Sequence, residues 1–333
     1  TTAVGALNEY VVDPDQVITT PPSLITTEKF TPNDPGRSRE FVDWKDEGFG
    51  ALDVIGGTSN SSNVYFYQLG GGTDNVSNVP NDVPGGLGIC RLGTYAKALG
   101  YGANPGIELP DEADGLIPTP KWKRIAHGEN WSTGDTYIAS VGQGFVVSTP
   151  LQVLMSAATI ANDGKLMRPT LIHEITDGEG TLIQPFTPDL KWDITRDAII
   201  DVYNDPTSAG GCEAKLTGEK TTVESWVVDL VQTGMRAAVT GGTLEDTFQG
   251  FSIAAAGKTG TAEYCDTYAN EKGLCQPGNW PTHSWTVAYA PFENPEIAVV
   301  AFVYNGGEGA SVAGPIVKRT IEAYFEIKTI DSG

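Results

Sequence analysis

One stretch of the chain combines a fixed positive charge with hydroxyl groups and glycines: Ala256-Gly257-Lys258-Thr259-Gly260-Thr261-Ala262-Glu263. The glycines let another backbone approach closely, and Thr259 and Thr261 supply hydroxyl and amide donors beside the Lys258 ammonium group. This combination suits an anionic ligand, such as a carboxylate, that lies along the edge of a strand. Taken alone, the same residues are equally compatible with a glycine-rich turn that carries a solvated lysine.

A second polar stretch, Gly-Gly-Thr-Ser-Asn-Ser-Ser-Asn over residues 56–63, precedes an apolar and aromatic run over residues 64–69. A polar, turn-forming loop at the start of a buried helix can hold hydroxyl and amide groups at a binding site. For Ser61-Ser62-Asn63 alone, however, an ordinary helix cap built from serine and asparagine is the simpler interpretation.

The composition excludes some partners. The 333 residues are enough for one large domain or two ordinary ones, and 42 acidic against 21 basic residues give a net charge of -21. Such a charge repels nucleic acid and anionic membrane surfaces, so neither is an expected partner. The adjacent acids Asp111 and Glu112 could suggest glycosidase chemistry, but neighbouring acids in a turn-rich loop are typical of surface charge.

The chain contains four cysteines. Cys265 and Cys275 bracket a loop that contains Gly, Pro and Asn, which predicts a local disulfide formed in an oxidising compartment. Free thiols or a partial metal site are the alternatives, but none of the three histidines is spaced with a cysteine as a zinc motif requires. We therefore expect no metal site, and the state of Cys90 and Cys212 stays open.

Cap signals and apolar spacing predict the main elements. The best-marked helix covers residues 151–161, where Thr149 is a natural N-cap, Pro150 fits the first helical position and Gln152 completes a capping box. Apolar periodicity predicts further helices over 1–10, 91–99, 223–239 and 313–327, strands over 284–290 and 296–304, and a hairpin over 171–185. The remaining segments are expected to be an extended connection over 12–39 with room for one short hairpin, a turn-rich stretch over 101–131 and a surface insertion over roughly 204–221.

Together these motifs resemble the transpeptidase domain of class B penicillin-binding proteins, most closely the elongation branch, whose superfamily carries S-x-x-K, S-D-N and K-T-G motifs. The third motif is Lys258-Thr259-Gly260-Thr261, and the second is Ser61-Ser62-Asn63. Between them, in the family's order, stand Gly-Ile-Glu-Leu-Pro-Asp-Glu (106–112), Gly-Asp-Thr (134–136), Val-Gly-Gln-Gly (141–144), Thr-Pro-Leu-Gln (149–152) and Ala-Asn-Asp-Gly (161–164).

The resemblance covers nearly all of residues 1–333 and implies one transpeptidase domain, with a helical lobe over roughly 40–165. The implied fold class is α/β (α+β), of the serine β-lactamase/D,D-transpeptidase type: an antiparallel sheet flanked by helices, with N-terminal sheet strands missing. It also implies the chemistry of a serine D,D-transpeptidase that forms an acyl-enzyme on a peptidoglycan stem peptide, without metal or organic cofactor.

The resemblance assigns roles to the motif residues. Ser61 would pass a proton toward the leaving amine, and Asn63 would hold the acyl amide. Lys258 would supply positive charge for the substrate carboxylate. The Thr259 and Thr261 hydroxyls would bind that carboxylate with Gly260 between them, and the Thr261 N–H would be one of two oxyanion donors.

No Ser-x-x-Lys occurs in the sequence; Thr26-Thr27-Glu28-Lys29 has the nearest spacing but the wrong hydroxyl and the wrong place. The resemblance implies that the nucleophile motif lies just upstream of Thr1. Two strands, a pedestal region and a membrane anchor would also lie outside the sequence. The chain alone is therefore expected to be inactive.

The implied partners are stem peptides ending in D-Ala-D-Ala, β-lactam antibiotics, a glycosyltransferase and other elongation-complex proteins, at the extracytoplasmic face of the bacterial cell membrane. Two alternatives stay open: an acyl-serine hydrolase, such as a β-lactamase or carboxypeptidase, and a non-catalytic cell-wall scaffold.

Overall fold

The lysine motif lies on a three-stranded antiparallel sheet with the strand order β11-β12-β13. The strands are β11 (Ala256–Glu263), β12 (Thr282–Ala290) and β13 (Ile297–Val303), and Lys258 pairs with Val287. The predicted strands over 284–290 and 296–304 are confirmed. The computed structural model describes residues 1–28, 37–205, 211–276 and 278–331.

Both faces of this sheet are covered. Alternate residues of the strands enter two different apolar clusters, because successive side chains of a strand point to opposite faces. Val287 and Tyr289 pack with the large cluster that includes residues of helix α8 (Ser225–Gly241), whereas Ala288 packs with residues of helix α11 (Gly314–Asp331). The predicted helices over 223–239 and 313–327 are thus confirmed. The sheet has two edge strands, β11 and β13, and the lysine motif lies on β11.

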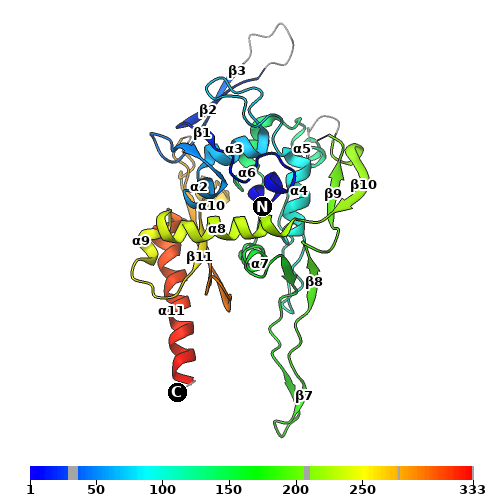
Figure 1. Ribbon diagram of the computed structural model, residues 1–333, viewed down its shortest axis with the longest axis vertical. Coiled ribbons are helices and arrows are strands. Elements are labelled where there is room, and N and C mark those ends of the chain that lie inside the picture. Colours follow the sequence, from blue (N-terminus) through cyan, green and yellow to red (C-terminus); the bar gives the residue numbers. More distant parts are fainter. Residues whose placement is uncertain (29–36, 206–210, 277, 332–333) are drawn as a thin grey trace.

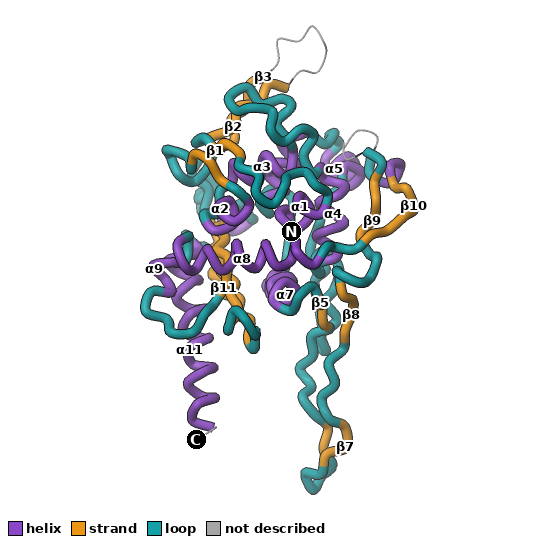
Figure 2. The backbone as a smooth tube through the Cα atoms, in the orientation of Figure 1, coloured by secondary structure: helices purple, strands orange, loops and turns teal. Residues whose placement is uncertain are grey.

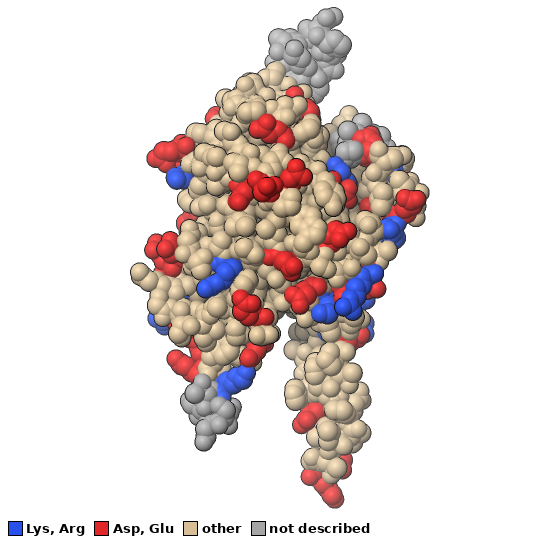
Figure 3. Space-filling model, in the orientation of Figure 1, with Lys and Arg blue, Asp and Glu red and all other residues tan. Residues whose placement is uncertain are grey.

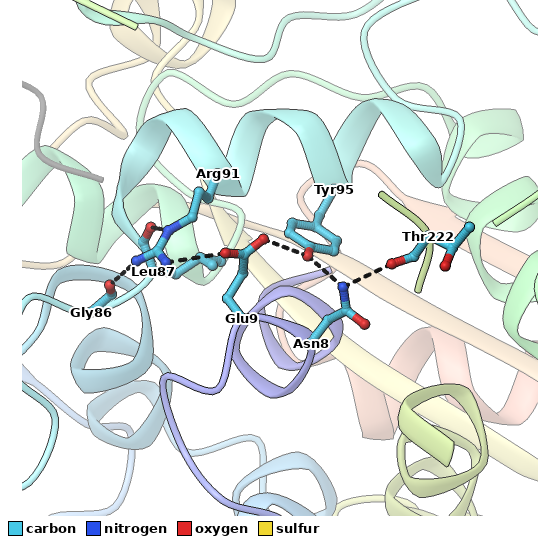
Figure 4. Close-up of polar contacts among 7 residues, drawn as sticks. All are labelled: Asn8, Glu9, Gly86, Leu87, Arg91, Tyr95 and Thr222. Carbon is cyan, nitrogen blue, oxygen red and sulfur yellow. Dashed lines mark hydrogen bonds and ion pairs between the residues drawn. The ribbon is translucent and has the colours of Figure 1, made fainter. Parts of the chain in front are cut away.

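A short central helix, α1 (Thr2–Asn8), lies among α3 (Asn63–Gly71), α4 (Gly88–Ala98) and α8, and its residues 2–7 are buried. Its C-terminal end is fixed by polar contacts (Figure 4). Glu9 forms an ion pair with Arg91 at 3.2 Å and accepts a hydrogen bond from the Tyr95 hydroxyl at 2.8 Å. Burial, with the negative charge of Glu9, raises the pKa of Tyr95, so the phenol stays protonated and donates.

Six helices, α2 to α7, lie along residues 53–164, between strands β4 (Gly50–Leu52) and β5 (Lys165–Met167). Helix α7 (Pro150–Ala161) confirms the best-marked prediction, since Thr149 and Gln152 form both hydrogen bonds of the capping box. Helix α4 confirms the predicted helix over 91–99.

Three helices in this region were not predicted. Helix α2 (Val54–Ser59) runs through much of the stretch that was expected to be a loop, because the Asp53 side chain caps it and Gly57 lies against the Tyr65 ring, where a Cβ would come within 2.3 Å of Cδ1. The stretch over 101–131 contains α5 (Pro120–His127), and α6 (Thr133–Ser140) follows it. Each is only eight residues long. Both have side-chain N-caps, and α5 is also amphipathic, but so short a segment does not make that pattern decisive.

The hairpin predicted over 171–185 is confirmed: β6 (Ile175–Thr176) pairs with β7 (Leu182–Gln184) near the end of a long arm (Figures 1 and 2). The arm's surface is mostly uncharged (Figure 3). Its exposed large apolar side chains are Leu171, Ile172, Ile175, Leu182, Ile183, Phe186 and Leu190.

The smaller antiparallel pairs lie around this framework. In the predicted extended connection, β2 and β3 form the expected hairpin, while residues 29–36, and with them Lys29, lie outside the described residues. The bounds are β1 (Ile18–Thr20) with β4 (Gly50–Leu52), β2 (Ser23–Glu28) with β3 (Arg37–Val42), β5 (Lys165–Met167) with β8 (Leu190–Asp193), and β9 (Ile200–Tyr203) with β10 (Leu216–Thr221). The short helices are η1 (Glu213–Lys215), α9 (Glu245–Phe248), α10 (Thr267–Glu271) and the π-helix η2 (Gly309–Ala313).

Two disulfides staple the chain. The predicted Cys265–Cys275 bridge is present, and a second bridge joins Cys90 of α4 to Cys212. Cys212 belongs to the segment predicted as an insertion, of which residues 206–210 lie outside the described residues. Among the described helices, none is long and apolar enough to cross a membrane.

Candidate active site

Lys258 lies on the edge strand β11 and reaches across to a turn of the helical region. Its Nζ donates to the Ser61 Oγ at 2.5 Å and to the Thr259 carbonyl oxygen at 2.8 Å. The side chain is half-buried, and desolvation lowers its pKa from 10.5 to about 8. The structure thus brings together two of the three predicted catalytic residues, from positions 197 residues apart.

The turn that carries Ser61 joins α2 to α3. Ser61 has a φ of 54°, a left-handed conformation that few residues other than glycine adopt. The next residue, Ser62, caps α3 by accepting a hydrogen bond from the Tyr65 backbone N–H at 3.1 Å. The helix-cap interpretation is therefore correct for Ser62, whereas Ser61 faces the lysine.

Asn63, the third predicted catalytic residue, is the first residue of α3. Its backbone N–H donates to Asp43 Oδ1 at 3.0 Å. Its half-buried side chain makes no hydrogen bond to the part of the chain that the structure describes, so the amide is available to a ligand.

The predicted carboxylate-binding residues are adjacent on β11, but their hydroxyls have protein partners. Thr259 Oγ1 donates to Thr243 Oγ1 at 3.0 Å. Thr261 Oγ1 donates to Glu308 Oε2 at 3.3 Å. A substrate carboxylate that binds Thr261 would therefore have to displace a carboxylate of the protein. The close approach of η2 depends on glycine: a Cβ on Gly309 would lie 2.6 Å from the Gly260 carbonyl oxygen.

Gln143, which follows α6 and belongs to the Val-Gly-Gln-Gly motif (141–144), is a residue of this site to which the sequence assigned no role. Its Nε2 donates to the Thr261 carbonyl oxygen at 2.8 Å. The N–H and C=O of one strand residue point to the same side, so the Thr261 N–H also faces the open edge of β11. That orientation fits an oxyanion donor. The contact joins residues 118 positions apart, and no local pattern could have revealed it.

The site is built from side chains and backbone amides without an evident metal centre. Across the described ranges, no group of three or more His, Cys, Asp or Glu side chains is placed to hold a metal ion.

Comparisons with known proteins agree with this geometry. The model of the penicillin binding protein transpeptidase domain matches residues 1–322. Peptidoglycan D,D-transpeptidase MrdA of Haemophilus influenzae is 30% identical over 329 residues, which cover 97% of this chain and 42% of the relative. Pseudomonas aeruginosa PBP2, solved with WCK 5153, is 26% identical with a TM-score of 0.65, over 97% of this chain and 56% of that one.

A chain from a solved peptidoglycan synthase complex, whose polymerization and crosslinking are structurally coordinated, is 28% identical with a TM-score of 0.69, over 98% of this chain and 45% of that one. These neighbours confirm the predicted fold class. The present chain spans less than half the length of the Haemophilus influenzae relative. With a lysine strand that faces a Ser-x-Asn turn and a family match over nearly all its residues, the chain belongs to the penicillin-binding protein transpeptidase domain family, in its PBP2/MrdA-type branch.

Proposed function

We propose that the chain is part of a peptidoglycan D,D-transpeptidase that cross-links stem peptides in cell-wall elongation. The observation that carries this proposal is the contact between Lys258 Nζ and Ser61 Oγ at the open edge of β11. A strand edge that has no neighbouring strand can bind an extended peptide as an added strand. The flanking lysine favours a peptide that ends in a carboxylate.

The proposed reaction uses a serine that lies in a Ser-x-x-Lys motif upstream of Thr1. Its Oγ attacks the carbonyl carbon of the penultimate D-Ala, and the bond to the terminal D-Ala nitrogen breaks, which leaves an acyl-enzyme. Ser61 relays a proton to the leaving amine while Asn63 orients the acyl amide. An amine of a second stem peptide then attacks the ester and releases the serine.

β11 supplies the electrostatic part of the site. Lys258, Thr259 and Thr261 bind the terminal carboxylate, with Gly260 allowing close approach, and the Thr261 N–H stabilises the oxyanion. Removing one such donor typically lowers the rate by about 10²–10³. The upstream serine would supply the second donor, which is why the chain alone is expected to be inactive.

The proposed location is the extracytoplasmic face of the cell membrane, where the two disulfides are stable. The resemblance to a chain of a peptidoglycan synthase complex supports a glycosyltransferase as partner. Within the domain, we assign residues 40–165 to the helical lobe and residues 204–221 to an insertion.

The test is covalent labelling of the full-length protein, with its upstream segment, by a fluorescent penicillin. We expect Ser61→Ala and Lys258→Ala to slow labelling by about 10²-fold, because each removes a group that acts on the reacting atoms. Lys97→Ala, which changes an exposed lysine of α4, is the control and should label at the wild-type rate. The chain of residues 1–333 alone should not label.

Absence of labelling in a folded full-length protein that carries the upstream motif would refute the assignment. The reaction products separate the hydrolase alternative. A transpeptidase gives cross-linked peptide when an acceptor amine is supplied, whereas a carboxypeptidase gives only the shortened stem and D-Ala.

A further inference from the structure

The Ser61 turn, residues 60–63, holds an unfavourable backbone conformation. A left-handed φ is unfavourable at a residue with a Cβ, because the Cβ comes too close to the following carbonyl oxygen, and Ser61 has a φ of 54°. The turn keeps this conformation only if its surroundings impose it. Since the direction of the Ser61 side chain depends on that φ, the residues that hold the turn also determine where Ser61 Oγ lies.

Asp43, directly after β3, is the first of these residues. It is only 7% exposed, and its carboxylate accepts hydrogen bonds from Ser62 Oγ at 2.5 Å, from Asn63 N at 3.0 Å and from Val64 N at 3.1 Å. Hydrogen bonds to an ionised acceptor are about twice as strong as neutral ones, and a negative charge is favourable at a helix N-terminus. Asp43 thus fixes the side of the Ser61 turn that leads into α3.

Trp44 holds the other side. Its indole Nε1 donates to the Asn60 carbonyl oxygen at 3.0 Å and to the Ser61 carbonyl oxygen at 3.2 Å. The Trp44 backbone N–H donates to Asp43 Oδ1 at 2.8 Å, which links the two residues. Trp44 is 57% exposed, so core packing does not explain its large side chain. Its polar contacts are with the Asn60 and Ser61 carbonyl groups, which lie before and after the Ser61 Cα.

We propose that Asp43 and Trp44 form a clamp on the Ser61 turn, which positions the Ser61 hydroxyl against Lys258 for proton transfer. The inference deepens the proposed transpeptidase function and rests on it. Asp43 and Trp44 are positioning residues, because they contact the turn and reach neither Lys258 nor the edge of β11.

The decisive variant is Trp44→Phe in the full-length protein. It keeps an aromatic ring against Phe49, whose centroid lies 5.3 Å away, but removes the indole donor. We expect the acylation rate constant for a fluorescent penicillin to fall about tenfold or more, because a small misplacement of a catalytic group is costly. The dissociation constant of the preceding noncovalent complex should change little, since β11 makes that complex. Asp43→Asn should likewise lower the acylation rate constant and leave the dissociation constant of the noncovalent complex nearly unchanged.

Trp192→Phe is the matched control. Trp192 Nε1 also donates to a backbone carbonyl, that of Ala98 at 2.8 Å, far from the turn along the chain. If Trp192→Phe slowed acylation as much as Trp44→Phe, the effect would be one of general stability and the clamp would be refuted. If Asp43→Asn fails to fold, the acylation rate of Trp44→Phe still tests the clamp.

A second readout does not depend on transpeptidase activity. The pKa of Lys258, about 8, can be measured by competitive labelling with an amine reagent followed by peptide mass mapping. A looser Ser61 turn lets water reach Lys258. The pKa of Lys258 should therefore rise toward 10.5 in Trp44→Phe and remain unchanged in Trp192→Phe. If the folded full-length protein does not label with penicillin but the Lys258 pKa still responds to Trp44→Phe, the transpeptidase proposal fails while the clamp on the Ser61 turn stands. If neither the acylation rate nor this pKa responds to Trp44→Phe, the clamp is refuted.

Discussion

At the scale of single residues, the ionisation of Lys258 governs what the site can bind. Desolvation lowers its pKa from 10.5 in the unfolded chain to about 8 in the folded chain. Between these pH values the unfolded chain carries a proton that the folded chain has lost. The free energy of unfolding therefore rises with pH across that window, and the gain is lost as the pH falls through 8. Near neutral pH Lys258 stays charged, at the expense of unfolding free energy, and places a cation at the edge of β11.

The cation at Lys258 predicts a pH dependence. In the full-length protein, acylation by penicillin should decline above about pH 8, because the neutral amine no longer attracts the drug's carboxylate. Lys258→Arg, whose side chain stays charged, should keep the positive charge to higher pH. Since other groups also titrate, the quantity to measure is the ratio of wild-type to Lys258→Arg rate constants from pH 6 to 10. A ratio that stays constant across this range would contradict the role of the Lys258 charge.

The residue scale also shows where prediction from sequence ended. Lys258 and Ser61 were identified because each stands in a short motif. Gln143, although it stands in the Val-Gly-Gln-Gly motif, and Trp44 were assigned no role, because their roles come from hydrogen bonds to backbone carbonyls that folding brings near. Every residue has a backbone carbonyl, so the sequence does not show which of them a given side chain will contact. Thr261 was expected to bind a substrate carboxylate, and its contact with Glu308 could not be foreseen either.

At the scale of elements, the caps and long apolar periods gave α7, α8 and the strands β12 and β13 correctly. The helices that were missed are short segments, and α2, with its glycines, also has low helix propensity. They are helical because tertiary packing favours it, and a local pattern cannot report that packing. Helix α1 was predicted, as part of the helix over 1–10, and it too depends on packing: residues 2–7 are buried, and its end is held by the contacts in Figure 4.

The ion pair at the end of α1 predicts a measurable coupling. Arg91 donates to the Leu87 and Gly86 carbonyls as well as to Glu9, and the Arg91 and Glu9 side chains are only 14% and 22% exposed. Arg91→Met leaves the Glu9 charge without its partner and should lower the free energy of unfolding by about 3 kcal/mol. Denaturant unfolding measures this change.

The double variant Glu9→Gln/Arg91→Met tests the cause. It removes the charge that the single variant leaves unpaired, so it should regain part of the lost stability. Purely additive losses in this double-mutant cycle would show that Arg91 stabilises the protein through its contacts with the Gly86 and Leu87 carbonyls and not through its pairing with Glu9.

At the scale of the whole molecule, the two disulfides close loops of very different length. Cys90–Cys212 has a sequence separation of 122 and ties α4 to a segment beyond the hairpin arm, whereas Cys265–Cys275 has a separation of 10 and closes a local loop after β11. The short spacing made only the local bridge predictable. The long bridge depends on how α4 and β9 pack together, which the positions of the cysteines in the sequence do not encode.

The difference in loop length predicts a difference in stability. In the chain-entropy model, a crosslink stabilises by restricting the unfolded chain, and the longer loop should contribute about 2 kcal/mol more than the shorter one. Cys90→Ser/Cys212→Ser should therefore lower the free energy of unfolding more than Cys265→Ser/Cys275→Ser, measured by denaturant unfolding of the oxidised proteins. Equal losses, or a larger loss for the short loop, would mean that native contacts around the bridges outweigh the restriction of the unfolded chain. Comparing the two decreases in unfolding free energy thus shows whether the long bridge stabilises the fold more than the local bridge in the loop after β11.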